Sequence, residues 1–220
     1  MKLYRLKQYL KLFTNYKKLK YTTSLALEKA YLNEIGYVKS IEKGIPYSKD
    51  GTPIPWLTYS FIYFINGRLK PEMTILEFGS GNSTLYWSKR VKKVESIEHD
   101  PIWFEKFTSK DLPQNVNITL KSTGKNGDYS KCFKTSKKTK FSIILIDGIK
   151  RVECIKNNYK LLEANGVMVL DNSERDCYLS GINFLIDEGF KKLDFWGLAP
   201  GVLNHGCTSV FYKEKNCLGL

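Results

Sequence analysis

Side chains able to do chemistry follow short apolar runs at several points along this chain. Carboxylates and amides of this kind can accept hydrogen bonds from hydroxyl groups or hold a divalent cation, and a carboxylate or a histidine can take a proton from a substrate. If the apolar runs are parallel strands, their carboxyl ends meet at one edge of a sheet and share one crevice. We therefore expect a single site built from residues in these positions: Glu98, His99, Asp147, Asp171 and Asn172.

A glycine-rich turn precedes these residues in the sequence. The apolar run at 74–78 continues into Gly79-Ser80-Gly81, and the two glycines let the backbone turn tightly and approach a ligand before a helix begins. Thr84 stands where the dinucleotide-binding pattern GxGxxG needs its third glycine, which argues against NAD or FAD. Glu98, 17 residues past Gly81, is placed to accept hydrogen bonds from both hydroxyls of an adenosine ribose. The combination predicts a cofactor that contains adenosine.

The elements that position these residues alternate along the chain. Apolar runs typical of strands cover residues 74–78, 93–97, 117–120, 141–146, 166–170, 192–196 and 208–212. Helical patterns cover residues 58–66, 83–90, 103–106, 151–163 and 178–189. This alternation predicts an α/β domain with a doubly wound, mostly parallel seven-stranded sheet. No helix separates the last two strands, so the last strand should be antiparallel.

The positive charge of the chain is confined to two segments. There are 35 Lys and Arg against 22 Asp and Glu, which gives a net charge of +13. Residues 1–21 hold seven basic residues and no acid, and residues 121–140 hold seven Lys against Asp128, so these segments account for the whole excess. A neutral body with two local basic segments argues against a protein that wraps nucleic acid, which spreads Lys and Arg over a continuous face.

The first basic segment has the pattern of an amphipathic helix. Leu3, Leu6, Leu10 and Phe13 recur at steps of three and four residues, with Lys filling the other positions. A basic amphipathic helix over residues 1–21 can lie on an anionic membrane surface. It can equally pack on the domain or on a second subunit, as in a homodimer, and the sequence leaves these alternatives open.

Domain organisation and compartment follow from composition. Residues 1–54 are expected to form a helical, turn-rich extension, and residues 55–220 the α/β domain. The five cysteines are odd in number, widely spaced and without a CxxC pair, which is typical of a reduced, cytoplasmic environment. No stretch reaches the roughly 18 apolar residues needed to cross a bilayer. We expect a cytoplasmic protein that meets the inner face of a membrane, if at all, through its N-terminal helix.

Four motifs, in order, resemble those of the class I S-adenosylmethionine-dependent methyltransferases. Ile75–Thr84 resembles the glycine-rich first motif of that family, and Ser96–Asp100 its acidic second motif. Phe141–Gly148 and Gly166–Asn172 are similar to the motifs of its fourth and fifth strands. The resemblance covers residues 55–213 and implies a Rossmann-like fold with S-adenosylmethionine as cofactor. That cofactor carries no phosphate, so the loss of the third glycine is expected.

The resemblance also implies which residues meet the cofactor. The glycine-rich turn would line its methionine part, Glu98 would hold the ribose hydroxyls, His99 would lie beside the adenosine, and Asp128 with Tyr129 would meet the adenine. The complete predicted set is Glu77, Gly79, Gly81, Asn82, Ser83, Glu98, His99, Asp128, Tyr129 and Asp147.

The predicted catalytic residues are Asp147 and His205. Asp147, Asp171 and Asn172 resemble the ligand set of metal-dependent catechol-type O-methyltransferases, in which Mg²⁺ or another divalent cation lowers the pKa of a substrate hydroxyl. Against this, an acid after the fourth strand also occurs in methyltransferases without a metal, and Asp171 with Asn172 could cap the next helix. His205, in the Gly- and Pro-containing segment 199–206 that is expected to form a loop between the last two strands, is the other candidate base.

These observations predict a methyltransferase that acts on an oxygen of a small molecule or a glycan precursor. A basic N-terminal helix would suit a lipid-linked or polysaccharide precursor at a membrane. Two alternatives remain: a nucleic-acid methyltransferase whose basic segments grip phosphates, and a non-catalytic module that binds S-adenosylmethionine. A nitrogen acceptor is also open.

Overall fold

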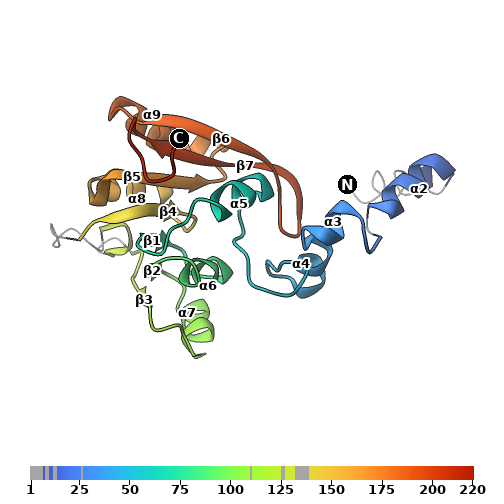
Figure 1. Ribbon diagram of the computed structural model, residues 1–220, viewed down its shortest axis with the longest axis horizontal. Coiled ribbons are helices and arrows are strands. Elements are labelled where there is room, and N and C mark those ends of the chain that lie inside the picture. The colour runs from blue at the N-terminus through green and yellow to red at the C-terminus, as the bar shows by residue number, and fades with distance from the viewer. Residues whose placement is uncertain are drawn as a thin grey trace.

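The computed structural model describes residues 7, 10–11, 14–25, 27–109, 111–124, 127–131 and 139–220 (Figure 1). Its centre is a seven-stranded sheet in the order β3-β2-β1-β4-β5-β7-β6. β7 runs antiparallel to both of its neighbours, and the other described pairs are parallel. The strands are β1 Thr74–Phe78, β2 Lys93–Glu98, β3 Val116–Leu120, β4 Phe141–Ile146, β5 Leu162–Asp171, β6 Lys191–Ala199 and β7 Val202–Tyr212. The predicted α/β, doubly wound sheet with an antiparallel last strand is confirmed.

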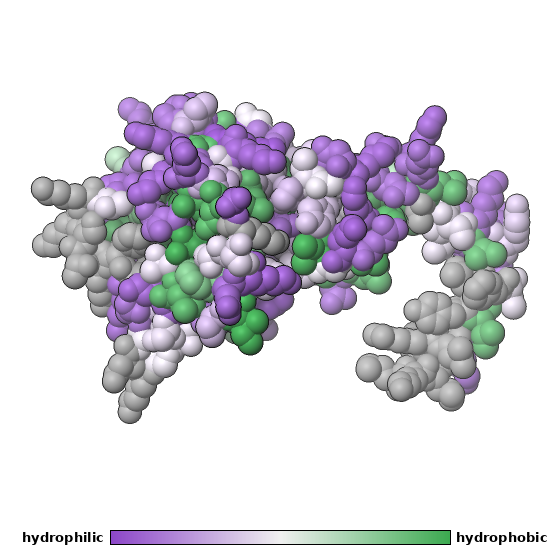
Figure 2. Space-filling view, turned by 90° about the horizontal axis from the view of Figure 1, so that it is seen from below, coloured by the Kyte–Doolittle hydropathy of each residue, from purple (hydrophilic) through white to green (hydrophobic). Residues whose placement is uncertain are grey.

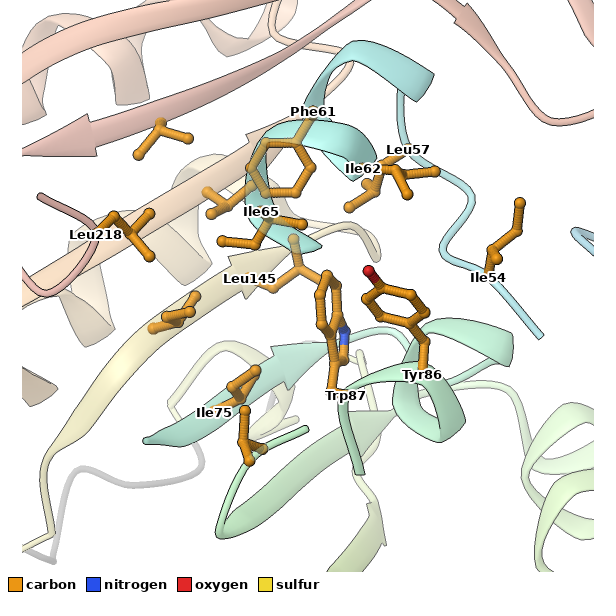
Figure 3. Packing of buried hydrophobic residues seen from close by; sticks show 14 of the residues in the cluster. Ile54, Leu57, Phe61, Ile62, Ile65, Ile75, Tyr86, Trp87, Leu145 and Leu218 are labelled. Carbon is orange, nitrogen blue, oxygen red and sulfur yellow. The ribbon is translucent and has the colours of Figure 1, made fainter. Parts of the chain in front are cut away.

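Helices cover both faces of the sheet. They are α5 Tyr59–Asn66, α6 Asn82–Ser88, α7 Pro101–Thr108, α8 Arg151–Asn158 and α9 Leu179–Asp187. Successive strand residues point to opposite faces, so Ile75 and Leu76 enter two separate hydrophobic clusters. Figure 3 shows the first cluster, in which Phe61 of α5 and Trp87 of α6 lie over the sheet near Leu145. Both clusters reach the strand ends and hold the connecting loops in place.

The last two strands form a longer hairpin than the sequence predicts. β6 and β7 continue beyond residues 196 and 208, with Trp196 paired to Cys207 and Ala199 paired to Val202. The Gly- and Pro-containing segment has a loop-like composition, but its backbone groups pair across the hairpin. The prediction that His205 lies in a loop is therefore wrong, because His205 belongs to β7.

The described part of the N-terminal extension includes the short helices α2 Tyr16–Ser24, α3 Tyr31–Glu34 and α4 Tyr37–Lys43. The helix predicted over residues 1–21 is not continuous, because Asn15 caps a new helix by accepting from the backbone N–H of Lys18 at 3.0 Å. Leu3, Leu6 and Phe13 lie outside the described residues.

The three helices of the extension differ in how closely they approach the sheet. Figure 1 shows α4 near the β6–β7 hairpin and α2 projecting away from the sheet. In the part of the chain that the structure describes, no helix is long and apolar enough to cross a membrane.

Candidate functional site

The glycine-rich turn after β1 is organised by two buried side chains, Glu77 and Thr84. The Thr84 hydroxyl donates to Glu77 Oε2 at 2.5 Å and accepts from the backbone N–H of Gly81 at 3.0 Å. Trp87 Nε1 and the Ser96 hydroxyl also donate to the Glu77 carboxylate. Burial nevertheless raises the pKa of Glu77 to about 7. The residue at the place of the third glycine therefore fixes the turn, and Glu77 supports it from inside the domain.

The carboxylate of Glu98, at the end of β2, is saturated by protein donors. Its Oε2 accepts from the backbone N–H and the hydroxyl of Ser80, at 2.9 and 2.8 Å. Its Oε1 accepts from the backbone N–H groups of His99 and Asp100, at 2.7 and 2.9 Å, and His99 Nδ1 also lies 2.9 Å away. Only the side-chain donors can be exchanged for ribose hydroxyls without moving the backbone. The predicted ribose contact therefore requires the Ser80 hydroxyl or the His99 ring to turn away.

Close packing between two glycines shapes the floor of the turn. Gly79 has a φ of 98°, and a Cβ on it would come within 3.1 Å of Gly148. A Cβ on Gly148 would in turn come within 2.0 Å of the Tyr129 hydroxyl oxygen. Tyr129 is fully buried and packs edge-on against the rings of Phe78 and His99. In this structure Tyr129, predicted to meet the adenine, supports the site from the core and offers no surface to a ligand.

Asp128, the other residue predicted to meet the adenine, lies at the surface. Its side chain is about half exposed, and Lys121 Nζ lies 2.8 Å from its Oδ2. The hydrogen bond from Lys121 lowers the pKa of Asp128. Contact with an adenine amino group would require this ion pair to open, and the contact stays a prediction.

A narrow pocket of about 130 Å³ lies above the glycine-rich turn. Trp103 of α7 forms one wall, because its Nε1 donates to the Ser80 carbonyl at 2.7 Å and its ring stacks on Phe107. The segment before α5 lies across the pocket, held where Asn82 Nδ2 donates to the Pro46 carbonyl at 2.6 Å. The predicted cofactor residues that line this turn pocket are Gly79, Gly81, Asn82, Ser83 and Asp147.

A second pocket, of about 540 Å³, lies beside the turn pocket at the ends of β4, β5 and the β6–β7 hairpin. Its polar lining residues are Thr58, Asp147, Asp171, Asn172, Glu174, Arg175, Asn204 and His205. Two residues, Trp56 and Asp147, line both pockets. A ligand in the turn pocket and a ligand in this polar pocket would therefore meet beside Asp147.

The two aspartates of the polar pocket hold protons more tightly than exposed aspartates do. Burial and the neighbouring charge of Asp171 raise the pKa of Asp147 well above its usual range, although Arg151 acts in the opposite direction. Burial likewise raises the pKa of Asp171 to about 6. The Thr208 hydroxyl, which donates to Asp171 Oδ1 at 2.7 Å, acts in the opposite direction and lowers this pKa. Arg151 Nη2 lies 3.2 Å from Asp147 Oδ1. A carboxyl with a raised pKa is suited to take up a proton near neutral pH.

Arg151 ties together the ends of the two central strands of this site. Its Nε donates to the Gly148 carbonyl at 2.8 Å, and its Nη2 donates to the Asp147 carbonyl at 2.9 Å. Its Nη1 donates to the carbonyl of Asp171. The side chain is buried, so its guanidinium places a fixed positive charge beside both aspartates.

The predicted metal ligands, Asp147, Asp171 and Asn172, come together at the polar pocket but fit a divalent cation poorly. The Arg151 guanidinium would stand beside the cation and repel it, and one Asp171 oxygen already accepts from Thr208. Residues 14–25, 27–109, 111–124, 127–131 and 139–220 contain no group of three His, Cys, Asp or Glu side chains arranged to hold a metal ion. The metal site at these three residues stays a prediction.

His205, the second predicted base, lies at the rim of the polar pocket. Its ring stacks on Trp196, with 4.8 Å between ring centroids and 23° between planes. His205 is exposed, whereas Asp147 lies where the two pockets meet. The geometry therefore favours Asp147 over His205 as the group nearest to a reacting atom.

Several residues of the site carry no signal in the sequence. Trp103 belongs to a short helix of ordinary composition, and only its hydrogen bond to Ser80 reveals its place in the turn pocket. The sequence places Arg151 at the start of a helix, and nothing in it shows that the side chain links the ends of β4 and β5. Trp56 could be found from its aromatic type and its position before the first strand, but not as a residue shared by two pockets.

Comparison with known proteins finds similarity in structure. No protein-family model matches the chain, and no curated protein matches it. A precorrin-6y C5,15-methyltransferase from Geobacter metallireducens has a TM-score of 0.57 and 16% identity, over 79% of this chain and 97% of that chain. A caffeoyl-CoA O-methyltransferase-like protein from Staphylococcus aureus has a TM-score of 0.55 and 16% identity, over 88% and 98%. A precorrin 8w decarboxylase from Methanobacterium thermoautotrophicum has a TM-score of 0.51 and 16% identity, over 78% and 97%.

These similarities show the fold. The chain has the Rossmann-like fold of the class I S-adenosylmethionine-dependent methyltransferases, as its motifs predicted. At these identities the similarity extends to the arrangement of elements, and the chemistry has to be argued from the residues of this chain.

Proposed function

We propose that this protein is an S-adenosylmethionine-dependent methyltransferase that methylates a hydroxyl oxygen of a small polyhydroxylated acceptor, such as a sugar of a glycan precursor. The observation that carries this proposal is the meeting of two pockets at Asp147. One pocket is lined by the glycine-rich turn, whose Ser80 donates to the acid at the end of β2, and the other pocket is polar and larger. Transfer between two bound molecules needs this arrangement, because proximity and alignment supply much of the rate enhancement.

The turn pocket would hold the cofactor. Gly79 and Gly81 leave room for the methionine part, and Asn82 and Ser83 offer polar groups at the start of α6. Glu98 would accept hydrogen bonds from the ribose hydroxyls in place of the one from the Ser80 hydroxyl, with the His99 ring, whose Nδ1 lies 2.9 Å away, turned aside. The residues named here are acidic or neutral, so none of them would repel the positively charged sulfonium group.

Asp147 would act as the general base. S-adenosylmethionine would supply the methyl group, which leaves the sulfonium sulfur as its bond to the acceptor oxygen forms. The acceptor hydroxyl gives its proton to Asp147, whose raised pKa matches the task. The Arg151 guanidinium stabilises the ionised carboxylate before the transfer, and Asp171 keeps its proton affinity high.

The acceptor class follows from the lining of the polar pocket. Trp56 and Trp196 are each partly exposed beside it, and His205 stacks on Trp196, so flat apolar surfaces lie next to polar groups. Asn172 and Asn204 offer both donors and acceptors of hydrogen bonds. A sugar presents apolar C–H faces and several hydroxyls, and it suits such a lining.

Methyl transfer from tritiated S-adenosylmethionine tests the proposal. Wild-type protein would be incubated with separate panels of methyl glycosides, catechols, primary amines and single-stranded RNA. We expect label in the glycoside panel, as a methyl ether that survives mild alkali. Label in the amine or RNA panel alone would contradict the acceptor class, and label in none of the panels together with no binding of S-adenosylmethionine would contradict the enzyme.

A further inference from the structure

The N-terminal extension carries an exposed surface that the methyltransferase domain does not use. None of the described side chains of α2 is buried, and its basic residues Lys17, Lys18 and Lys20 have no acidic neighbour in the sequence before Glu28. Isolated helices shorter than about 12–15 residues are marginal in water. A helix of nine residues with no buried face therefore needs a surface on which to pack.

Large apolar side chains are concentrated on this same extension. Seven of the sixteen exposed large hydrophobic residues of the described chain lie between residues 10 and 41: Leu10, Tyr16, Tyr21, Leu25, Leu27, Tyr31 and Ile41. Figure 2 shows apolar groups interspersed with hydrophilic ones along the projecting arm. Aromatic and aliphatic side chains beside lysines are the composition of a segment that lies in a membrane interface.

The extension is attached near the mouth of the polar pocket. A Cβ on Gly201, at the tip of the β6–β7 hairpin, would lie 3.5 Å from the backbone of Ser40 in α4. Ile41 and Leu203, exposed by 54% and 81%, belong to these two neighbouring segments. A surface that bound α2 could therefore also meet the hairpin that lines the polar pocket.

We propose that α2 and the segment that follows it, residues 16–31, dock the protein on an anionic lipid membrane, with the polar pocket held close to that surface. Charge complementarity selects this occupant. A second copy of the chain would bring the same positive charge to the interface. The chain outside its two basic segments is neutral overall, so it offers no net negative charge to pair with the lysines. A nucleic acid would require a continuous basic face that includes the body. The proposal concerns location, so it stands or falls separately from the proposed reaction.

Co-sedimentation of the full-length protein with vesicles tests the proposal. One set of vesicles would be phosphatidylcholine alone, and the other phosphatidylcholine mixed with phosphatidylglycerol. We expect binding to the mixed vesicles only. The triple variant Lys17→Glu, Lys18→Glu, Lys20→Glu should reduce that binding at least about 100-fold, because each Lys near an anionic surface contributes roughly fivefold. The variant Tyr16→Ser, Tyr21→Ser, Leu25→Ser should also weaken it, by loss of apolar contact.

A matched control changes the same charge elsewhere on the molecule. Lys89 and Lys92 are exposed before β2 and Lys93 is exposed at its first residue, and reversal of all three alters the net charge equally. This control variant should bind as the wild type does. Equal loss in the control, equal binding to both vesicle types or no binding by the wild type would overturn the proposal. Two other results would also overturn it: a dimer in sedimentation analysis that only the α2 variants disrupt, or tight RNA binding that only they abolish.

Discussion

The turn pocket and the polar pocket meet at Asp147 but are built on opposite principles. Behind the turn pocket, the buried Glu98 carboxylate accepts four hydrogen bonds from protein donors, two of them from Ser80 of the turn, so it fixes the backbone. In the polar pocket, Asp147 and Asp171 share one neighbouring positive charge, the Arg151 guanidinium, and the pKa values of both carboxyls are raised. The Glu98 carboxylate therefore holds the turn in place, whereas carboxyls with a raised pKa can take up protons. Glu77, buried under the turn, also has a raised pKa, about 7, but it lines neither pocket.

The largest effect is expected at the junction of the two pockets. Asp147→Asn removes the proposed base while it keeps the size of the side chain, and loss of a general base typically costs about 10²–10⁴-fold in rate. We expect kcat for methyl transfer to fall by about that factor, with the affinity for S-adenosylmethionine within about fivefold of the wild type. A loss in affinity that matched the loss in rate would mean that Asp147 serves the turn pocket instead.

The packing of the turn pocket can be broken by one methyl group. Gly148→Ala would place a Cβ 2.0 Å from the Tyr129 hydroxyl oxygen, so we expect about 1–3 kcal/mol less stability in urea unfolding. Tyr129→Phe removes the opposing oxygen, and the double variant should recover part of that loss. If the double variant is no more stable than Gly148→Ala alone, the close approach of these two residues is not what limits the turn.

The stability of the polar pocket should respond to pH through Asp171. Because the pKa of Asp171 is raised to about 6, its protonated form is favoured in the fold. The stability that this protonated carboxyl contributes to the folded state is complete below pH 4, near the pKa of an aspartate in the unfolded chain. It is lost as pH rises through about 6, the pKa in the folded state. Asp171→Asn should therefore match the wild type near pH 4 and exceed its stability by up to about 3 kcal/mol at pH 8. Thermal unfolding at both pH values measures this, and a constant difference would contradict it.

A smaller effect is expected for Thr84, which stands at the place of the third glycine. Thr84→Val keeps the shape but removes the hydroxyl bonds to Glu77 and to the Gly81 N–H, so we expect a loss of about 1–3 kcal/mol. Thr84→Ser keeps both bonds and should lose less than half of that. Equal losses in the two variants would show that the methyl packing, rather than the hydroxyl, holds the turn.

The smallest effect is expected on removal of divalent cations. Since the Arg151 guanidinium already stands beside Asp147, dialysis against EDTA should leave methyl transfer unchanged. A loss of activity that Mg²⁺ restores would contradict this reading and would support the metal site predicted at Asp147, Asp171 and Asn172.

The fold was accessible from the sequence because local patterns determine it. The runs at 74–78 and 141–146 match β1 and β4 at both ends, since buried parallel strands are continuously apolar. The length of the β6–β7 hairpin was not accessible, because Gly197 and Gly201 suggest a loop, and pairing across the hairpin is a tertiary event.

The positions of the site residues were accessible, but most of their interactions were not. Asp147 and Glu98 were identified because strand ends share an edge. That Ser80 occupies one oxygen of Glu98 and that Arg151 joins two strand ends depends on side chains meeting across loops, which spacing does not encode. Asp128 and Tyr129 show the same limit, because exposure and burial separate two neighbouring residues.

The most direct test of the account is calorimetric titration of S-adenosylmethionine into the wild type, Glu98→Gln and Glu105→Gln. Glu98 is the buried acid that accepts from Ser80 of the glycine-rich turn, and Glu105 is an exposed carboxylate on α7 that serves as the matched control. Hydrogen bonds to a charged group contribute about 1.5–3 kcal/mol, so Glu98→Gln should weaken binding by about 10–100-fold while Glu105→Gln binds as the wild type does. No binding by the wild type, or equal affinity in all three proteins, would contradict the assignment of the cofactor site.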